Sequence, residues 1–186
     1  TYAGGTRFGA NSVLVGSDTA LGAGAVAIEG NTTLSSNAPR ALANAFSIGA
    51  GSTLTIAGPG LALGGTVSGD GGILKVSGSE MVLSGANTYA GGTRVAQGTL
   101  RIANTSGSAT GLGTVTVSKG ATLAGIGTIA GPVVVNAGGR LSVGASVGTM
   151  NTGALTLAAG SSLDMELGQA GVVGGAFNDL LNVSGD

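Results

Sequence analysis

The sequence predicts an all-β chain that folds as a right-handed parallel β-helix, a solenoid of about eight or nine coils. Three observations support this prediction. Glycine accounts for 39 of the 186 residues, whereas only 7 residues are basic and 8 acidic. A short apolar phrase recurs in uneven steps of roughly 21 residues, which is typical of repeat architectures. Within each phrase, apolar and polar residues alternate with the period of a β-strand.

The recurring phrase consists of an apolar–x–apolar triplet, a glycine-containing corner and a second short apolar segment. It occurs at Val26–Leu34, Phe46–Leu54, Val95–Leu100, Val115–Leu123, Val133–Leu141 and Leu155–Leu163. One aliphatic residue of each coil is expected to face the interior, so that successive coils bury a shared apolar ladder. The residues predicted for this core ladder are Leu34, Leu54, Val76, Leu100, Leu123, Leu141, Leu163 and Val183.

The units are predicted to be strands because their apolar runs are too short for helices before Gly, Asn or Ser interrupts them. In residues 163–167, the apolar side chains share one face while Asp164 and Glu166 share the other. Three short strands in about 21 residues describe one coil, and coils stacked about 4.8 Å apart would form a rod roughly 40 Å long. The uneven step favours a right-handed helix, since left-handed β-helices usually keep a strict hexapeptide count.

The composition excludes several classes of function. The sequence has no cysteine or histidine, which rules out disulfides, thiolate metal sites, haem ligation by histidine and nucleophile–histidine triads. No cofactor or metal is therefore expected. A formal net charge of −1 argues against nucleic acid as a partner, because that binding depends on Lys and Arg contacts to phosphate.

Two long uncharged stretches, 41–69 and 121–139, raise the question of a membrane span. Both are interrupted every few residues by Gly, Pro, Ser, Thr or Asn, so a transmembrane helix is not expected. The chain opens with Thr-Tyr-Ala-Gly-Gly, without the basic start and apolar run of a signal peptide. We therefore expect residues 1–186 to be a single β-helix fragment of a longer protein.

The segment Thr1–Arg7 recurs unchanged as Thr88–Arg94, inside a longer phrase that covers residues 65–100. Within it, Leu83-Ser84-Gly85-Ala86-Asn87-Thr88-Tyr89-Ala90-Gly91-Gly92-Thr93 resembles the core of the passenger-associated transport repeat of bacterial type V autotransporters. The resemblance implies a passenger exported across the outer membrane of a Gram-negative-type bacterium, with a C-terminal β-barrel in the full-length protein. Residues 155–186 resemble the start of the C-terminal, autochaperone-like region of such passengers.

The most conspicuous local motif consists of Asn87, Thr88, Tyr89, Gly91, Gly92 and Thr93. A functional interpretation makes Tyr89 a platform on which a sugar stacks. The structural interpretation has Asn87 bonding to corner backbone, Tyr89 packing over a coil edge and the glycines adopting positive φ. The structural interpretation is favoured.

Other polar residues have a functional and a structural interpretation. Asp164 and Glu166 could form a catalytic carboxylate pair, but a solvated face explains them as well, and Asp179 is expected to cap a turn. The segment Gly69-Asp70-Gly71-Gly72 resembles one fragment of a calcium-binding nonapeptide, although no second Asp follows at the spacing of that repeat. Arg94, Arg101 and Lys119 could line one face, with a solubilising role as the default.

The leading functional hypothesis is a structural and display module, a surface stalk or adhesin with no enzymatic activity. Host or cell-surface ligands are the expected partners. An alternative is self-association, because terminal coils expose unpaired strand edges and the low net charge removes repulsion. A third and weaker hypothesis is an enzyme that acts on polysaccharides, since other right-handed β-helices carry clustered acids for that purpose.

Overall fold

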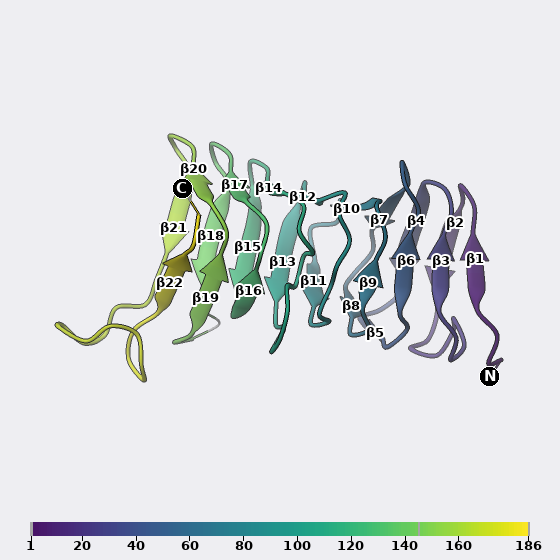
Figure 1. Cartoon of the computed structure of the whole chain (residues 1–186), viewed down its shortest axis with the longest axis horizontal. Coiled ribbons are helices and arrows are strands. Elements are labelled where there is room, and N and C mark those ends of the chain that lie inside the picture. Colours follow the sequence, from purple (N-terminus) through teal and green to yellow (C-terminus); the bar gives the residue numbers. More distant parts are fainter. Residues whose placement is uncertain (1, 145, 186) are drawn as a thin grey trace.

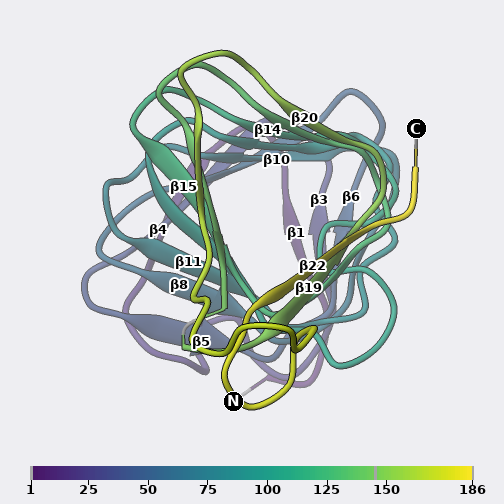
Figure 2. The same ribbon diagram turned by 90° about the vertical axis from the view of Figure 1, so that its left-hand side faces the viewer.

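A computed structural model describes residues 2–144 and 146–185 and shows a solenoid of stacked coils (Figure 1). Within these residues there is no helix, and the paired strands run parallel. Viewed from the C-terminal end, the chain turns counterclockwise as it approaches the viewer (Figure 2). The solenoid is therefore right-handed, and its all-β parallel architecture with about eight coils is confirmed.

Four parallel sheets form the sides of the solenoid. The long sheet has eight strands: β2 (Ser12–Val15), β4 (Thr32–Ser36), β7 (Thr53–Ile56), β10 (Gly72–Lys75), β12 (Thr93–Val95), β14 (Val115–Val117), β17 (Val133–Val135) and β20 (Leu155–Leu157). The seven-stranded sheet contains β5 (Arg40–Leu42), β8 (Leu61–Leu63), β11 (Glu80–Leu83), β13 (Gly98–Ile102), β15 (Ala121–Gly125), β18 (Arg140–Val143) and β21 (Ser162–Asp164).

The third side is divided between two shorter sheets. The N-terminal sheet contains β1 (Thr6–Phe8), β3 (Val26–Ile28), β6 (Phe46–Ile48) and β9 (Val67–Ser68). The C-terminal sheet contains β16 (Gly127–Ile129), β19 (Thr149–Thr152) and β22 (Leu180–Val183). Between β9 and β16, two coils pass along this side without forming a strand.

The register explains the spacing of the repeated phrase. In the long sheet, paired residues are one coil apart: Thr93 pairs with Val115, and Val115 with Val133. In the seven-stranded sheet, Leu100 pairs with Leu123, and Leu123 with Leu141. Apolar residues at the same place in successive phrases are therefore neighbours in space.

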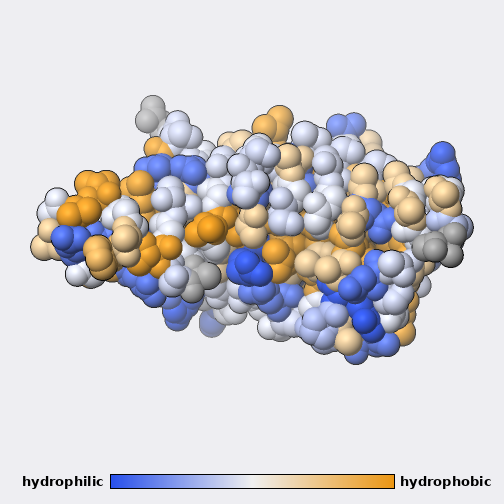
Figure 3. Space-filling view, turned by 90° about the horizontal axis from the view of Figure 1, so that it is seen from below, coloured by the Kyte–Doolittle hydropathy of each residue, from blue (hydrophilic) through white to orange (hydrophobic). Residues whose placement is uncertain are grey.

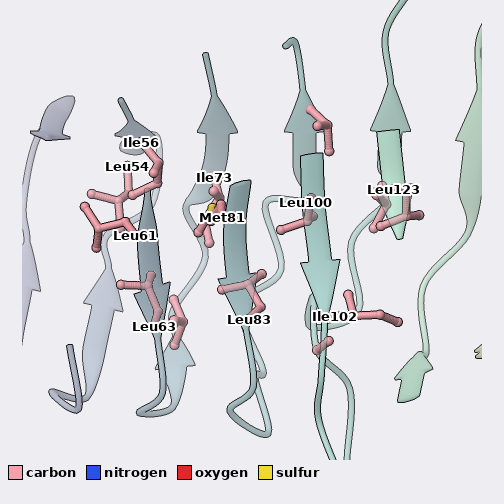
Figure 4. Packing of buried hydrophobic residues seen from close by; sticks show 14 of the residues in the cluster. Leu54, Ile56, Leu61, Leu63, Ile73, Met81, Leu83, Leu100, Ile102 and Leu123 are labelled. Carbon is pink, nitrogen blue, oxygen red and sulfur yellow. The ribbon is translucent and has the colours of Figure 1, made fainter. Parts of the chain in front are cut away.

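Alternate residues of each strand point into the solenoid and form one continuous core. Residues from facing sheets meet there, with Leu54 and Ile56 on β7 opposite Leu61 and Leu63 on β8 (Figure 4). All four are at most 2% exposed. Burying an aliphatic side chain of this size contributes about 1.5–3 kcal/mol, so the shared core supports the fold without disulfides.

The residues of the predicted core ladder lie in several stacks rather than one. Leu34 and Leu54 are both in the long sheet but are not register partners. Leu34 pairs with Ile56, and Leu54 pairs with Thr32. Leu100, Leu123, Leu141 and Leu163 are successive partners in the seven-stranded sheet. The predicted single ladder therefore corresponds to parallel ladders on different sides of the coil.

Three ladder positions differ from the prediction in their burial. Val76 follows β10 and is half-buried, because the alternation that places Ile73 inward also places Lys75 inward. Leu163 and Val183 are 40% and 46% exposed because they lie on β21 and β22, the last strands of their sheets. Hydropathy favoured Val76, but strand alternation gives the inward position to its neighbour.

The last coil contains an excursion. Met150 on β19 pairs with Leu181 on β22, so this coil is considerably longer than those before it. The extra residues, 165–179, leave the coil and project from the C-terminal end (Figure 1), where Leu167 and Asn178 form an antiparallel bridge. Figure 3 shows apolar residues gathered at this end. The exposed large apolar residues of the excursion are Leu167, Val172, Val173 and Phe177.

Candidate binding groove on the long sheet

The motif singled out in the sequence begins where the third side lacks strands and ends at Thr93, the first residue of β12. Asn87 is 3% exposed and links three successive coils: the Val67 N–H donates to its Oδ1 at 2.7 Å, and its Nδ2 donates to the Ala109 carbonyl at 2.5 Å. The backbone N–H of Asn87 donates to the Ser108 carbonyl. Asn87 therefore holds the corner backbone through its side chain, as the structural interpretation describes.

Tyr89 is fully buried, and its hydroxyl is hydrogen-bonded to Thr93 Oγ1. Burial raises the pKa of the Tyr89 phenol, an effect that the hydrogen bond to Thr93 partly offsets. The equivalent pair in the N-terminal copy, Tyr2 and Thr6, is also hydrogen-bonded. Thr1, the first residue of that copy, lies outside the described residues. Because Tyr89 is 0% exposed, it offers no platform for a sugar.

The two glycines of the motif have different roles. Gly92 has φ +77°, a conformation that L side chains rarely adopt. Gly91 is required by close approach: a Cβ there would lie 2.5 Å from the backbone carbon of Gly71. The same corner of other coils carries Gly113, Gly131 and Gly153, each with backbone of the preceding coil within 2.8 Å of its Cβ position. A column of glycines thus lets the coils stack tightly at this corner.

Two further polar side chains replace the missing strand on the third side. The Thr128 N–H donates to Asn104 Oδ1 at 3.0 Å, and Asn104 Nδ2 donates to the carbonyls of Ser106 and Gly107. Ser108 Oγ accepts from the Ala130 N–H at 3.0 Å and donates to the Gly111 carbonyl at 2.6 Å. Side chains therefore bind the backbone that a regular sheet would have paired.

A groove of about 730 Å³ lies on the outer face of the long sheet, over β7, β10, β12 and β14. Its floor is glycine backbone. Gly72 is the register partner of Thr53, and the Ile73 N–H donates to the Gly92 carbonyl. At this position, therefore, the coil with Thr53 carries a side chain, whereas the next two coils carry glycine. Thr114 forms part of the opposite wall. Successive coils have glycine at this position, where a Cβ on Gly72 or Gly92 would lie 2.7 Å from a carbonyl oxygen of the next coil.

Asp70 and Arg94 are the charged residues that line this groove. Both are exposed, and among the described residues neither has a side-chain hydrogen bond or ion pair. Three other arginines are each paired with an acid on the neighbouring coil: Arg7 with Glu29, Arg101 with Glu80 and Arg140 with Asp164. The groove therefore presents one carboxylate acceptor and one guanidinium donor that no other described side chain engages.

A second hollow, of about 280 Å³, brings together Asp164, Glu166 and Asp179 at the C-terminal end. Asp179 is 3% exposed; its Oδ1 accepts from the Gly148 N–H at 2.8 Å and its Oδ2 from the Glu166 N–H at 2.7 Å. Both oxygens are thus occupied in joining distant segments, a larger role than capping one turn. Asp164 is paired with Arg140.

The remaining candidates are dispersed over the surface. Arg94 is on β12 of the long sheet, Arg101 on β13 of the seven-stranded sheet and Lys119 on the turn after β14, so they do not share a face. Asp70 lies at an exposed corner between Gly69 and Gly71. In the part of the chain that the structure describes, no three Asp or Glu side chains are placed to hold a metal ion. No helix there could span a membrane.

Part of the chain around this groove matches a known protein family. Residues 73–102, which run from β10 to the end of β13, match the family model of the passenger-associated transport repeat. This match supports an autotransporter passenger that carries a passenger-associated transport repeat, and the chain is called the passenger segment from here on. Such a passenger is exported across the outer membrane, to the cell surface or into the medium.

The passenger segment is also similar to the adhesin BmaC autotransporter of Brucella suis biovar 1 (strain 1330). The two are 37% identical over 107 residues, which cover 50% of this chain and 3% of the adhesin. The chain thus spans a very small part of the length of that relative. No solved structure matches the passenger segment significantly.

Sequence reasoning missed two features of the passenger segment. Lys75 is 0% exposed, and its Nζ donates to the carbonyls of Ser77 at 2.6 Å and Gln97 at 3.1 Å. Burial lowers the pKa of Lys75, and the nearby Glu80 carboxylate partly offsets this effect. The groove was also missed. Its signal was the pair of doublets Gly71-Gly72 and Gly91-Gly92, one coil apart.

Proposed function

We propose that this passenger segment is the stalk of a surface adhesin and displays binding surfaces away from the outer membrane. The observation that carries the proposal is the long sheet, which continues through eight strands in one register along the solenoid. Each coil is held to the next by parallel backbone pairing and a shared core, so the segment behaves as a rod. The name of the similar Brucella protein, an adhesin, agrees with this role.

The same proposal covers the export of the passenger, its ligands and its C-terminal region. A C-terminal β-barrel would export and hold the passenger, and its ligands would be molecules on host or other cells. Residues 155–186 would begin an autochaperone-like region that folds early. This is supported by Asp179, whose side chain joins the start of β22 to Glu166 in the excursion and to Gly148.

Labelling of intact cells tests the stalk. Fab fragments raised against the 186-residue chain should bind cells that express the full-length protein and should reduce their adherence to host cells. A Fab against another abundant surface protein of the same cells is the matched control. Labelling that requires lysis of the outer membrane would refute surface display, and labelling without any change in adherence would refute the adhesin role.

Self-association is a second candidate, favoured by the exposed apolar side chains of the excursion. Val173, Leu167 and Phe177 are 82%, 76% and 59% exposed, and residues 167–178 contain no charged side chain. Sedimentation velocity over a hundredfold concentration range tests this function. Val173→Lys should shift the chain toward monomer, whereas Leu14→Lys, a change at a site 66% exposed near the other end, should not. Monomer throughout would refute the candidate.

We propose that the segment has no enzymatic activity. Of the three acids in the smaller hollow, Asp164 is ion-paired and Asp179 accepts two backbone N–H bonds, which leaves Glu166 without a free partner acid. Incubation with pectin, alginate and similar polymers tests this proposal. Turnover that is abolished by Glu166→Gln would overturn it and favour the polysaccharide-acting alternative.

A further inference from the structure

We propose that the groove on the long sheet binds a neutral, hydroxyl-rich oligosaccharide. The inference rests on the proposed adhesin function and assigns a ligand class to one site of the stalk.

The size and shape of the groove suit a short segment of a chain molecule. Its volume of about 730 Å³ lies within the range of about 300–1,000 Å³ that is typical of ligand sites. It crosses four adjacent strands, β7, β10, β12 and β14, which at about 4.8 Å per strand corresponds to about 14 Å. The groove is open, so a polymer could extend beyond it.

The lining matches sugar hydroxyls. Thr53, Thr114 and Thr116 each carry a hydroxyl that can both donate and accept, as sugar hydroxyls do. The glycine floor allows a ligand to approach the backbone closely, because no side chain rises from Gly72 or Gly92. Binding can therefore proceed through many small polar contacts.

The charges in the groove favour a neutral ligand. Arg94 supplies a fork of N–H donors and Asp70 supplies carboxylate acceptors, and neither is engaged elsewhere among the described residues. Because one charge of each sign is present, the groove has no excess of positive charge with which to attract a polyanion. A ligand with hydroxyls on both edges satisfies both groups.

No aromatic side chain is exposed in the groove, since Tyr89 is buried beneath this corner. Stacking therefore contributes nothing, and a dissociation constant near 1 mM, about −4 kcal/mol, is expected for one groove. Several passengers on one cell would raise the effective affinity by binding together.

Saturation-transfer difference NMR with the 186-residue chain tests the proposal. The probes are hexasaccharides of glucose, mannose, xylose and N-acetylglucosamine at concentrations well above the expected dissociation constant, and a peptide of alternating lysine and glutamate in a separate arm. At least one hexasaccharide should bind. Arg94→Gln and Asp70→Asn should each weaken binding at least fivefold. The matched controls Lys119→Gln and Glu166→Gln, which make the same charge changes on exposed residues outside the groove, should leave binding unchanged.

Three results would overturn the inference: no hexasaccharide binds, the peptide binds in preference to them, or the Arg94 and Asp70 variants bind as well as their controls. Circular dichroism of each variant checks that the fold is intact. Adherence of cells that express the full-length protein is measured in parallel. Adherence that persists when no hexasaccharide binds would refute the groove while leaving the adhesin function in place.

Discussion

The buried hydroxyl of Tyr89 is hydrogen-bonded to Thr93 four residues later, and the same pair occurs as Tyr2 and Thr6. The two copies lie on different sides of the solenoid, because Thr93 begins β12 of the long sheet whereas Thr6 begins β1 of the N-terminal sheet. The Thr-Tyr-Ala-Gly-Gly-Thr phrase therefore encodes a local corner that can precede a strand of either sheet. The copies differ in burial: Tyr89 is 0% and Tyr2 49% exposed.

This difference predicts unequal effects of the same substitution. Tyr89→Phe removes the hydroxyl and leaves Thr93 Oγ1 buried without its partner, so we expect the free energy of unfolding to fall by about 1–3 kcal/mol. Tyr2→Phe, at an exposed site, should change it by less than about 0.5 kcal/mol. Urea unfolding followed by far-UV circular dichroism measures both. Equal effects would show that the buried bond contributes nothing of its own.

Asn87 predicts a larger loss. Asn87→Ala removes two buried hydrogen bonds and leaves the Val67 N–H and the Ala109 carbonyl without these partners. We expect a loss of about 2–4 kcal/mol in the free energy of unfolding. Asn136→Ala is the matched control, since Asn136 is exposed and should tolerate the change within about 0.5 kcal/mol. If the Asn87 variant unfolds at the same urea concentration as the control, the side chain does not hold the corner.

The sequence predicted the architecture because a solenoid repeats its constraints in each coil. The recurring phrases and the alternation within them were sufficient to predict parallel strands, and Leu100, Leu123 and Leu141 are indeed successive register partners. Lys75 could not be predicted to face inward, because its hydropathy contradicts its place in the alternation. It is accommodated by the carbonyls of Ser77 and Gln97, which become neighbours only after folding.

The groove and the gap in the third side depend on relationships between coils, which explains why they were missed. Gly72 and Gly92 are separated by one whole coil of sequence and form one floor only in the correct register. Asn104 and Ser108 look like ordinary loop residues, yet their side chains replace strand pairing. The pattern of one sequence indicates how many residues make up a coil. It does not indicate which side chains form hydrogen bonds with the backbone of the neighbouring coil in place of strand pairing.

Glycine at the crowded corner predicts a clear contrast. Gly91→Ala would place a Cβ 2.5 Å from the Gly71 backbone carbon, which is held in place because the Gly91 N–H donates to the Gly71 carbonyl. We expect this variant to lose about 1–3 kcal/mol in the free energy of unfolding. Gly78→Ala has no atom within 4 Å of the new Cβ and no positive φ, so it should be neutral or gain up to about 1 kcal/mol. Similar unfolding midpoints for the two variants would contradict the close approach of these coils.

The buried Lys75 predicts a dependence of stability on pH. Burial lowers its pKa in the folded chain below the ordinary value of 10.5, so between these two values the unfolded chain binds more protons than the folded chain. In that window, the stability of the wild type should rise with pH relative to Lys75→Met. Below the pKa of the folded chain, the difference in free energy of unfolding between the two proteins should be constant.

Urea unfolding of the wild type and Lys75→Met at several pH values from neutral up to the ordinary lysine pKa of 10.5 measures this difference. Both proteins contain Tyr89, whose pKa is raised by burial, so its contribution at alkaline pH cancels in the comparison. Lys119→Met, which removes an ammonium from an exposed turn, is the control for the substitution. A difference for Lys75→Met that does not change with pH would mean that the buried ammonium is stabilised by the Ser77 and Gln97 carbonyls as fully as by water.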